Sequence, residues 1–179
     1  VNRAVSSFKK ESIVKYAEPD YAGYLHQTYP NDPAFSDQWG FDQASDVDID
    51  APEGWDVATG NTNPIVAVVD TGVDYNHEDL AANIWTNPNE ILNGLDDDGK
   101  GIPDDLHGFN AIASGGEGPG CGGNSDLGNP MDTYGHGTHV SGTIAGHGDN
   151  SKGVAGVNWR AKIMACKWID AYGAGWTSD

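Results

Sequence analysis

The sequence feature that most constrains the fold is an unbroken apolar run that ends in a carboxylate. The run consists of Pro64, Ile65, Val66, Ala67, Val68 and Val69, followed by Asp70. It is rich in β-branched side chains and lacks alternation, which is typical of a parallel strand buried on both faces. Ligands and catalytic groups gather at the carboxyl ends of such strands in open α/β sheets. We therefore expect an α/β fold with a functional carboxylate at Asp70.

Other segments carry weaker patterns of regular structure. Residues 50–60 predict a short helix with Asp50 as its N-cap. Residues 135–146 predict a helix with one apolar face, closed by a glycine. Residues 161–169 predict a second buried strand, and residues 12–17 alternate like a short strand. The chain therefore has the mixed elements of an α/β domain.

Composition excludes several classes of function. The 179 residues include 27 acidic and 9 basic side chains, a formal net charge of −18. This excess of acid repels phosphate groups, so nucleic acid and anionic membrane surfaces are not expected partners, whereas Ca²⁺ is a plausible one. No apolar stretch approaches the roughly 18 to 20 residues of a membrane span. We expect one large domain or part of a bigger one.

Asp70 and His136 form the pair of residues best suited to chemistry. Asp70 ends a predicted strand, and His136 begins a predicted helix 66 positions later, which can bring both to one edge of the sheet. An imidazole titrates near neutral pH, so it can take a proton from a hydroxyl group and return it to a leaving amine. A buried carboxylate holds that imidazole in the required tautomer. Asp70 and His136 therefore make two-thirds of a serine-protease triad.

Two other enzyme classes are weaker alternatives. Asp70-Thr71-Gly72 resembles half of an aspartic protease site, but the chain has no second Asp-Thr/Ser-Gly and this interpretation leaves His136 unused. His136 and His139 could instead bind zinc. Helical zinc pairs are spaced four apart with a glutamate between them, whereas these two are three apart without one.

Two motifs carry a resemblance to a known family. The first motif is Val68-Val69-Asp70-Thr71-Gly72-Val73-Asp74, followed by His77-Glu78-Asp79-Leu80. The second motif is His136-Gly137-Thr138-His139-Val140-Ser141-Gly142-Thr143. They resemble the aspartate and histidine signatures of the subtilisin-like serine proteases, in the family's order Asp, His, Ser.

The resemblance implies a fold and an activity. The expected fold is a subtilisin-like parallel sheet with helices on both faces, truncated before the half that bears the nucleophile. Asp70 becomes the orienting acid, His136 the general base and His139 a structural residue. Polypeptides are the implied substrates, no cofactor is needed for the chemistry, and the implied location is secreted, outside the cell.

The family's nucleophile is missing from this sequence. No Gly-Thr-Ser-Met-Ala type motif follows, and Ser141 lies in the same predicted helix as His136. We therefore expect a fragment whose parent is active, while the 179-residue chain alone is inactive and only marginally folded. A catalytically inactive, calcium-binding extracellular module is the alternative that involves no enzyme.

Residues 1–29 carry a second resemblance. Residues 8–21 resemble the last strand of a subtilase inhibitor prodomain, which implies that the protein's own prodomain is an intramolecular inhibitor. Maturation would cut between about residues 21 and 29, and residues 30–179 would be the incomplete N-terminal part of the catalytic domain. An ordinary N-terminal arm is the alternative.

Calcium is expected at two places. Asp32, Asp79 and Asn150 match a structural calcium site of the family that ties the mature N-terminus to a loop. Residues 96–105 form an alternating acidic turn like a shortened EF-hand loop, with ligands expected from Asp96, Asp98 and Asp104. A merely solvated acidic loop is the alternative for this second place.

The end of the chain suggests contact with substrate. Gly173, Ala174 and Gly175 resemble the family's edge segment, which pairs with an extended substrate backbone. Trp176 could form the floor of a pocket for an apolar side chain. The alternative for Gly173 to Gly175 is a simple turn.

Overall fold

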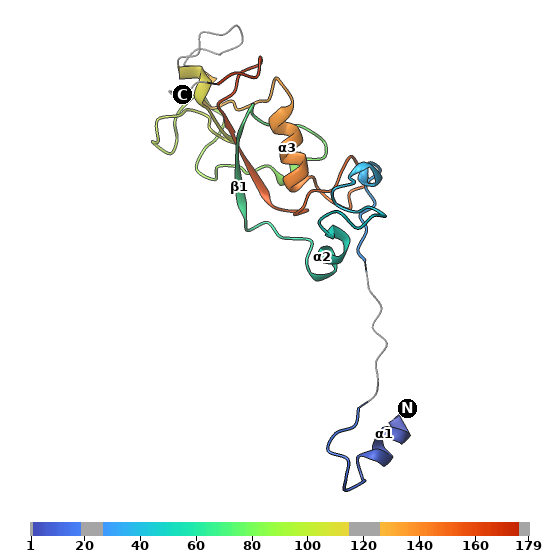
Figure 1. Cartoon of the computed structure of the whole chain (residues 1–179). Coiled ribbons are helices and arrows are strands. Elements are labelled where there is room, and N and C mark those ends of the chain that lie inside the picture. Colours follow the sequence, from blue (N-terminus) through green and yellow to red (C-terminus); the bar gives the residue numbers. More distant parts are fainter. Residues whose placement is uncertain (1, 19–26, 115–125, 176–179) are drawn as a thin grey trace.

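A three-stranded parallel sheet organises the chain (Figure 1). The computed structural model describes residues 2–18, 27–114 and 126–175. Strand β1 (Ile65–Asp70) pairs with β3 (Lys162–Lys167), which pairs with β2 (Gly108–Asn110), so the order is β1-β3-β2. The parallel α/β fold that the sequence predicts is confirmed, and the two apolar segments predicted as strands form β1 and β3.

Strand β2 is not evident from the sequence because it is only three residues long and begins with glycine. Gly108 has φ of +126°, and a Cβ at this position would lie 1.9 Å from the carbonyl oxygen of Ala165 on β3. Only glycine allows the two strands to approach this closely.

Helix α3 (His136–Ala145) covers one face of the sheet, as Figure 1 shows. It begins at His136 and ends before Gly146, as the sequence predicts. Its Val140 and Ile144 side chains pack against a core of buried apolar residues drawn from strands, loops and helix: Val68, Val73, Leu80, Ile84, Ala145, Ala161, Ile163 and Ala165. Burial of this apolar surface anchors α3 on one face of the sheet, with its first residue at the carboxyl end of β1.

The expectation that β1 is buried on both faces is wrong for the described residues. Ile65 and Val69 are 53% and 61% exposed, whereas Val68 on the opposite face is 5% exposed. Alternate residues point to opposite faces of a strand, and α3 packs on only one of these faces. The second layer of helices expected from the family resemblance is therefore not found among the described residues.

Helix α2 (Ala51–Val57) belongs to a second, aromatic core. The Trp55 ring lies 5.0 Å from that of Trp159 and within 6 Å of those of Phe35 and Phe41, measured between ring centroids. The helix forms where the sequence predicts it, but Asp50 is not a side-chain cap. The backbone of Asp50 adopts the left-handed helical conformation, with φ of 51°, and the Asp50 carboxylate makes no hydrogen bond to the helix. The cap prediction is therefore wrong.

The remaining described elements are short. Helix α1 (Asn2–Phe8) precedes a series of turns in which the Val14 N–H donates to the Glu11 carbonyl. The strand predicted over residues 12–17 is not formed, because no described strand offers it a hydrogen-bonding partner. Three 3₁₀ turns complete the set: Phe35–Asp37, Ala81–Asn83 and Ala111–Ser114. Within the described ranges, no helix is both long and apolar enough to cross a membrane.

Candidate active site

Asp70 and His136 meet at the carboxyl end of β1. His136 Nδ1 lies 2.8 Å from both carboxylate oxygens of Asp70. The Asp70 side chain is 12% exposed and that of His136 is 61% exposed. Because an ionised carboxylate only accepts hydrogen bonds, Nδ1 must carry the proton in this contact. His136 Nε2 is then left as the proton acceptor, on a ring that solvent can reach.

Two glycines allow the two segments to approach this closely. A Cβ on Gly137 would lie 2.1 Å from the Gly72 carbonyl oxygen and 3.0 Å from Asp70 Cβ. A Cβ on Gly72 would lie 2.3 Å from the Pro130 carbonyl oxygen, and Gly72 also has φ of +99°. The Gly137 N–H donates to the Thr71 hydroxyl at 2.9 Å, which connects the two motifs directly. Glycine at both positions therefore follows from the geometry of the pair.

A buried lysine that the sequence reasoning missed holds the turn before the histidine. Lys167 is 6% exposed and lies opposite Asp70 in the register of β1 and β3. Its ammonium donates to the Thr71 and Met131 carbonyl oxygens at 3.0 and 2.8 Å and to the Thr133 hydroxyl at 3.2 Å. These contacts connect the end of β1 to the segment that leads into α3. The sequence places Lys167 within the second predicted strand, residues 161–169, but no local signal marks it as buried.

Asp132 holds the first turn of α3 from the other side. Its carboxylate accepts the N–H groups of Tyr134, Gly135 and Thr138, each at 2.9 Å, and the Thr138 hydroxyl at 2.6 Å. Burial acts to raise the pKa of Asp132, but these hydrogen bonds outweigh it and hold the pKa below its usual value. Asp132 thus satisfies the Thr138 N–H in the first turn of α3, which would otherwise lack a partner, and fixes the turn that leads into the helix.

Acid should destabilise the protein partly through Asp132. Since its pKa is lower in the folded than in the unfolded state, Asp132 contributes stability above its usual pKa, and this is lost as pH falls through the folded value. We expect Asp132→Asn to melt at a lower temperature at neutral pH and to lose less further stability below about pH 4. Melting curves across this range test it, with exposed Asp37 changed to Asn as the matched control. If acid lowers the melting temperature of Asp132→Asn as much as that of wild type, this role of Asp132 is contradicted.

The other candidate groups near His136 do not compete with this pair. Ser141 is fully buried inside α3 at 0% exposure, so it cannot be a nucleophile for an external substrate. The Nδ1 atom of His136 is already engaged by Asp70. In the described ranges, the only cluster of three or more His, Cys, Asp or Glu side chains close enough to share a metal ion contains no histidine. The aspartic-protease alternative leaves the contact between Asp70 and His136 unexplained.

Comparison with known proteins identifies the family. Residues 61–179, more than half of the chain, match the peptidase S8 family, described as the subtilase family. This chain belongs to the subtilase family. The match contains Asp70 and His136 together with the residues that hold them.

Individual relatives agree with this assignment. The chain is 40% identical to "Subtilisin-like protease 1" of Plasmodium berghei over 146 residues, covering 80% of this chain and 22% of that protein. It is 33% identical over 150 residues to "Thermitase" of Thermoactinomyces vulgaris, covering 83% and 40% respectively. A solved protease structure from Pseudoalteromonas arctica superposes with a TM-score of 0.55 at 31% identity, covering 75% of this chain and 37% of the other. This subtilase chain thus spans less than half the length of these relatives.

The predicted substrate segment is a turn where it is described. The Ala174 carbonyl oxygen accepts the Asp170 N–H at 2.7 Å, and the Asp170 carboxylate accepts the Ala174 N–H at 3.0 Å. Gly173 has φ of +79° and lies against the ring of Tyr134, next to the start of α3. The segment thus lies close to the helix that bears His136. Trp176 lies outside the described residues.

The first predicted calcium site brings its three residues together. Asp79 Oδ1 accepts the Asn150 side-chain amide, and Asp79 Oδ2 accepts the Val154 N–H, both at 2.8 Å. Asp32 Oδ2 accepts the Asp149 N–H at 2.6 Å, while its buried Oδ1 has no hydrogen-bond partner. Burial raises the pKa of Asp32, although the backbone hydrogen bonds oppose this. An unsatisfied, buried carboxylate oxygen beside a second buried carboxylate fits a cation.

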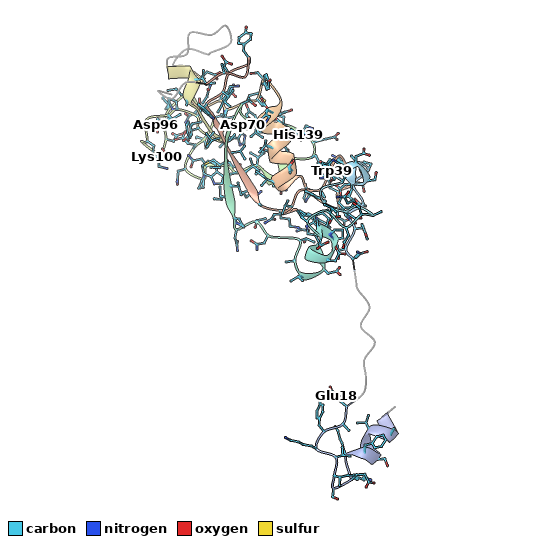
Figure 2. All side chains as sticks on the ribbon, in the orientation of Figure 1. Glu18, Trp39, Asp70, Asp96, Lys100 and His139 are labelled. Atoms are coloured by element: carbon cyan, nitrogen blue, oxygen red, sulfur yellow. The ribbon has the colours of Figure 1, made fainter. Side chains whose placement is uncertain are left out.

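The second predicted calcium site has a different arrangement from the one that the motif suggests. Asp96, labelled with Lys100 in Figure 2, accepts the backbone N–H groups of Gly99, Lys100 and Gly101, and so shapes the turn itself. Asp104 accepts the N–H groups of Asn93 and Gly94. Of the three predicted ligands, only Asp98 lies in a cluster of carboxylates, and its neighbours there are Glu90 and Asp105.

Proposed function

We propose that this chain is the part of a serine endopeptidase that supplies the acid and the base of its triad. The observation that carries the proposal is the contact of His136 Nδ1 with both Asp70 oxygens, with the rest of the ring exposed. In this mechanism Asp70 holds the tautomer and stabilises the imidazolium that forms. His136 Nε2 removes the proton from a serine hydroxyl as the hydroxyl attacks the substrate carbonyl, then delivers it to the leaving amine.

The serine is proposed to come from a part of the protein outside this sequence. Two facts support this: the only serine in α3 is buried, and the relatives are more than twice as long as the matched region. Polypeptides are the proposed substrates, since the relatives are named as proteases. We also propose a secreted protein in which residues 1–29 end an inhibitory prodomain. The Thr28 N–H donates to the Pro52 carbonyl oxygen in α2, and a cut before Thr28, within the predicted range of about residues 21 to 29, would keep this hydrogen bond in the mature protein.

Labelling with a fluorophosphonate probe tests the proposed activity. The full-length protein should form a covalent adduct on one serine, because the reagent requires a hydroxyl activated by a neighbouring base. His136→Ala should lose most of the labelling rate while remaining folded. If the folded, fully processed wild type takes up no label, the protein is the catalytically inactive module instead.

We further propose a structural Ca²⁺ ion held by Asp32, Asp79 and Asn150. When bound, the ion would supply positive charge to two buried carboxylates, and it would tie the segment at Asp32 to the loop after α3. A ligand that binds only the folded state stabilises it by about 2.7 kcal/mol at a hundredfold excess over Kd. Because the segment at Asp32 follows the proposed cut, calcium protection should increase on maturation.

Chelation should therefore lower the melting temperature of the mature protein. We expect a clear downward shift with a chelator in wild type and a much smaller shift in Asp79→Asn. Asp37→Asn, an exposed change of the same type, should shift like wild type. Equal melting temperatures of wild type in calcium and in chelator would rule out the ion, and a full shift in Asp79→Asn would rule out these ligands.

A further inference from the structure

Lys167 is a buried cation at the edge of the sheet that carries the proposed acid. Among the basic residues whose side chains the structure describes, it is the only buried one, at 6% exposure. It ends strand β3, and the parallel register places it opposite Asp70, the last residue of β1, which is labelled in Figure 2. Removing an ammonium from water is costly, whereas an apolar side chain of similar volume would fill this position without that cost. The ammonium therefore calls for a role beyond packing.

The Lys167 ammonium has three oxygens within hydrogen-bond reach. They are the Thr71 carbonyl oxygen at 3.0 Å, the Met131 carbonyl oxygen at 2.8 Å and the Thr133 hydroxyl at 3.2 Å. Since an ammonium carries three N–H donors, one group can hold all three oxygens. Thr71 directly follows Asp70, and residues 131–133 lead into α3, which begins at His136. Lys167 thus joins the two segments that position the proposed acid and base.

Thr71 connects Lys167 to both members of the pair. The Thr71 N–H donates to Asp70 Oδ1 at 2.7 Å, and the Thr71 hydroxyl accepts the Gly137 N–H at 2.9 Å. Thr71 is 1% exposed, so these groups are shielded from water. With its carbonyl oxygen held by Lys167, all three polar groups of Thr71 are fixed. A change in the backbone at Thr71 would therefore move the Asp70 carboxylate relative to the first turn of α3.

We propose that Lys167 is a positioning residue for the triad. Its ammonium fixes Thr71 and residues 131–133, and thereby keeps the acid and the base of the pair in contact. This inference rests on the proposed function. Catalytic groups must be held close to their productive geometry, and a displacement of about 1 Å can lower a rate about a hundredfold. Because the His136 ring gains and loses a proton in each turnover, its support must hold the ring in both charge states.

Peptide hydrolysis by full-length Lys167→Met tests this role. Methionine is an unbranched side chain without an N–H donor, so kcat should fall roughly ten- to a hundredfold, while KM changes less than about threefold. Lys167→Arg keeps the charge and the donors, and its kcat should be at least about threefold above that of Lys167→Met. Lys162→Met is the matched control at the other end of β3. It removes a hydrogen bond of 2.7 Å to the Ala82 carbonyl oxygen and should keep the wild-type kcat.

Proton NMR of the contact between Asp70 and His136 provides a readout that does not depend on activity. In protein labelled with ¹⁵N-histidine, the His136 Nδ1 proton should give a downfield resonance that is missing from His136→Ala. In Lys167→Met this proton should exchange with water at least about tenfold faster than in wild type, because the contact opens more often. Lys162→Met should leave the exchange rate unchanged.

Circular dichroism first establishes which variants are folded. If Lys167→Met does not fold, Lys167→Gln replaces it, since glutamine lacks the charge but keeps two N–H donors. A folded variant of Lys167 whose Nδ1 proton exchanges as slowly as in wild type would overturn the positioning role, as would equal losses in Lys162→Met. If the wild type hydrolyses no peptide, the proposed function fails, and the exchange rates alone then decide whether Lys167 holds the contact.

Discussion

Replacing His136 by alanine in the full-length protein should lower kcat for peptide hydrolysis about a thousandfold or more. Without the imidazole, nothing removes the proton from the serine hydroxyl, and Asp70 has no group to orient. Members of a triad act as a unit, so most of the rate enhancement is lost with any one of them. In subtilisin, a member of the same family, loss of the histidine lowers kcat about a millionfold, so a thousandfold is the smallest loss expected here.

His139→Ala is the matched control for this change. His139 lies one helical turn further along α3 and makes no hydrogen bond to the Asp70 side chain, so its loss should cost no more than about tenfold. Circular dichroism should show both variants folded. Comparable losses in the two variants would mean that His136 acts through the stability of α3 and not as the base.

Gly137→Ala should unfold the protein at a markedly lower urea concentration. The added Cβ would lie 2.1 Å from the Gly72 carbonyl oxygen and 3.2 Å from Asp70 Oδ1, so α3 must move away from β1. Overpacking of this kind costs about 1–3 kcal/mol. The same movement separates His136 from Asp70, so kcat should fall together with stability.

Gly142→Ala is the control in the same helix. Its Cβ would meet only a Val154 methyl group at 3.9 Å, an ordinary contact. Alanine in place of glycine inside a helix gains up to about 1 kcal/mol, so the urea midpoint should rise slightly. Equal midpoints for the two variants would show that the close approach at Gly137 does not limit stability.

The sequence predicts the central part of the site because its signals are local. An apolar run with Asp70 at its end identifies both the strand and its functional edge, since ligands collect at that edge of a parallel sheet. Helix α3 starts at the histidine motif and ends before Gly146, so the position of His136 follows from the helix boundary. The spatial proximity of Asp70 and His136 is confirmed by the 2.8 Å contact.

The missed features depend on contacts between segments far apart in the chain. Lys167 acts on carbonyl oxygens 36 and 96 positions away, and no local pattern distinguishes it from a surface lysine. The acidic loop shows a different limit. Alternation of Asp96 and Asp98 indicates a turn, but only the folded loop shows that Asp96 binds backbone N–H groups while Glu90 joins Asp98. The apolar run likewise does not show that one face of β1 is exposed, because exposure depends on which elements pack against the strand.

A crystal structure of the full-length protein after fluorophosphonate treatment is the most direct test of the central claim. Asp70 and His136 should keep their contact, with the phosphonylated serine oxygen within about 2.6–3.2 Å of His136 Nε2. The serine should lie outside residues 1–179. A labelled serine paired with a different base, or a separation of Asp70 and His136 beyond about 6 Å, would contradict the assignment.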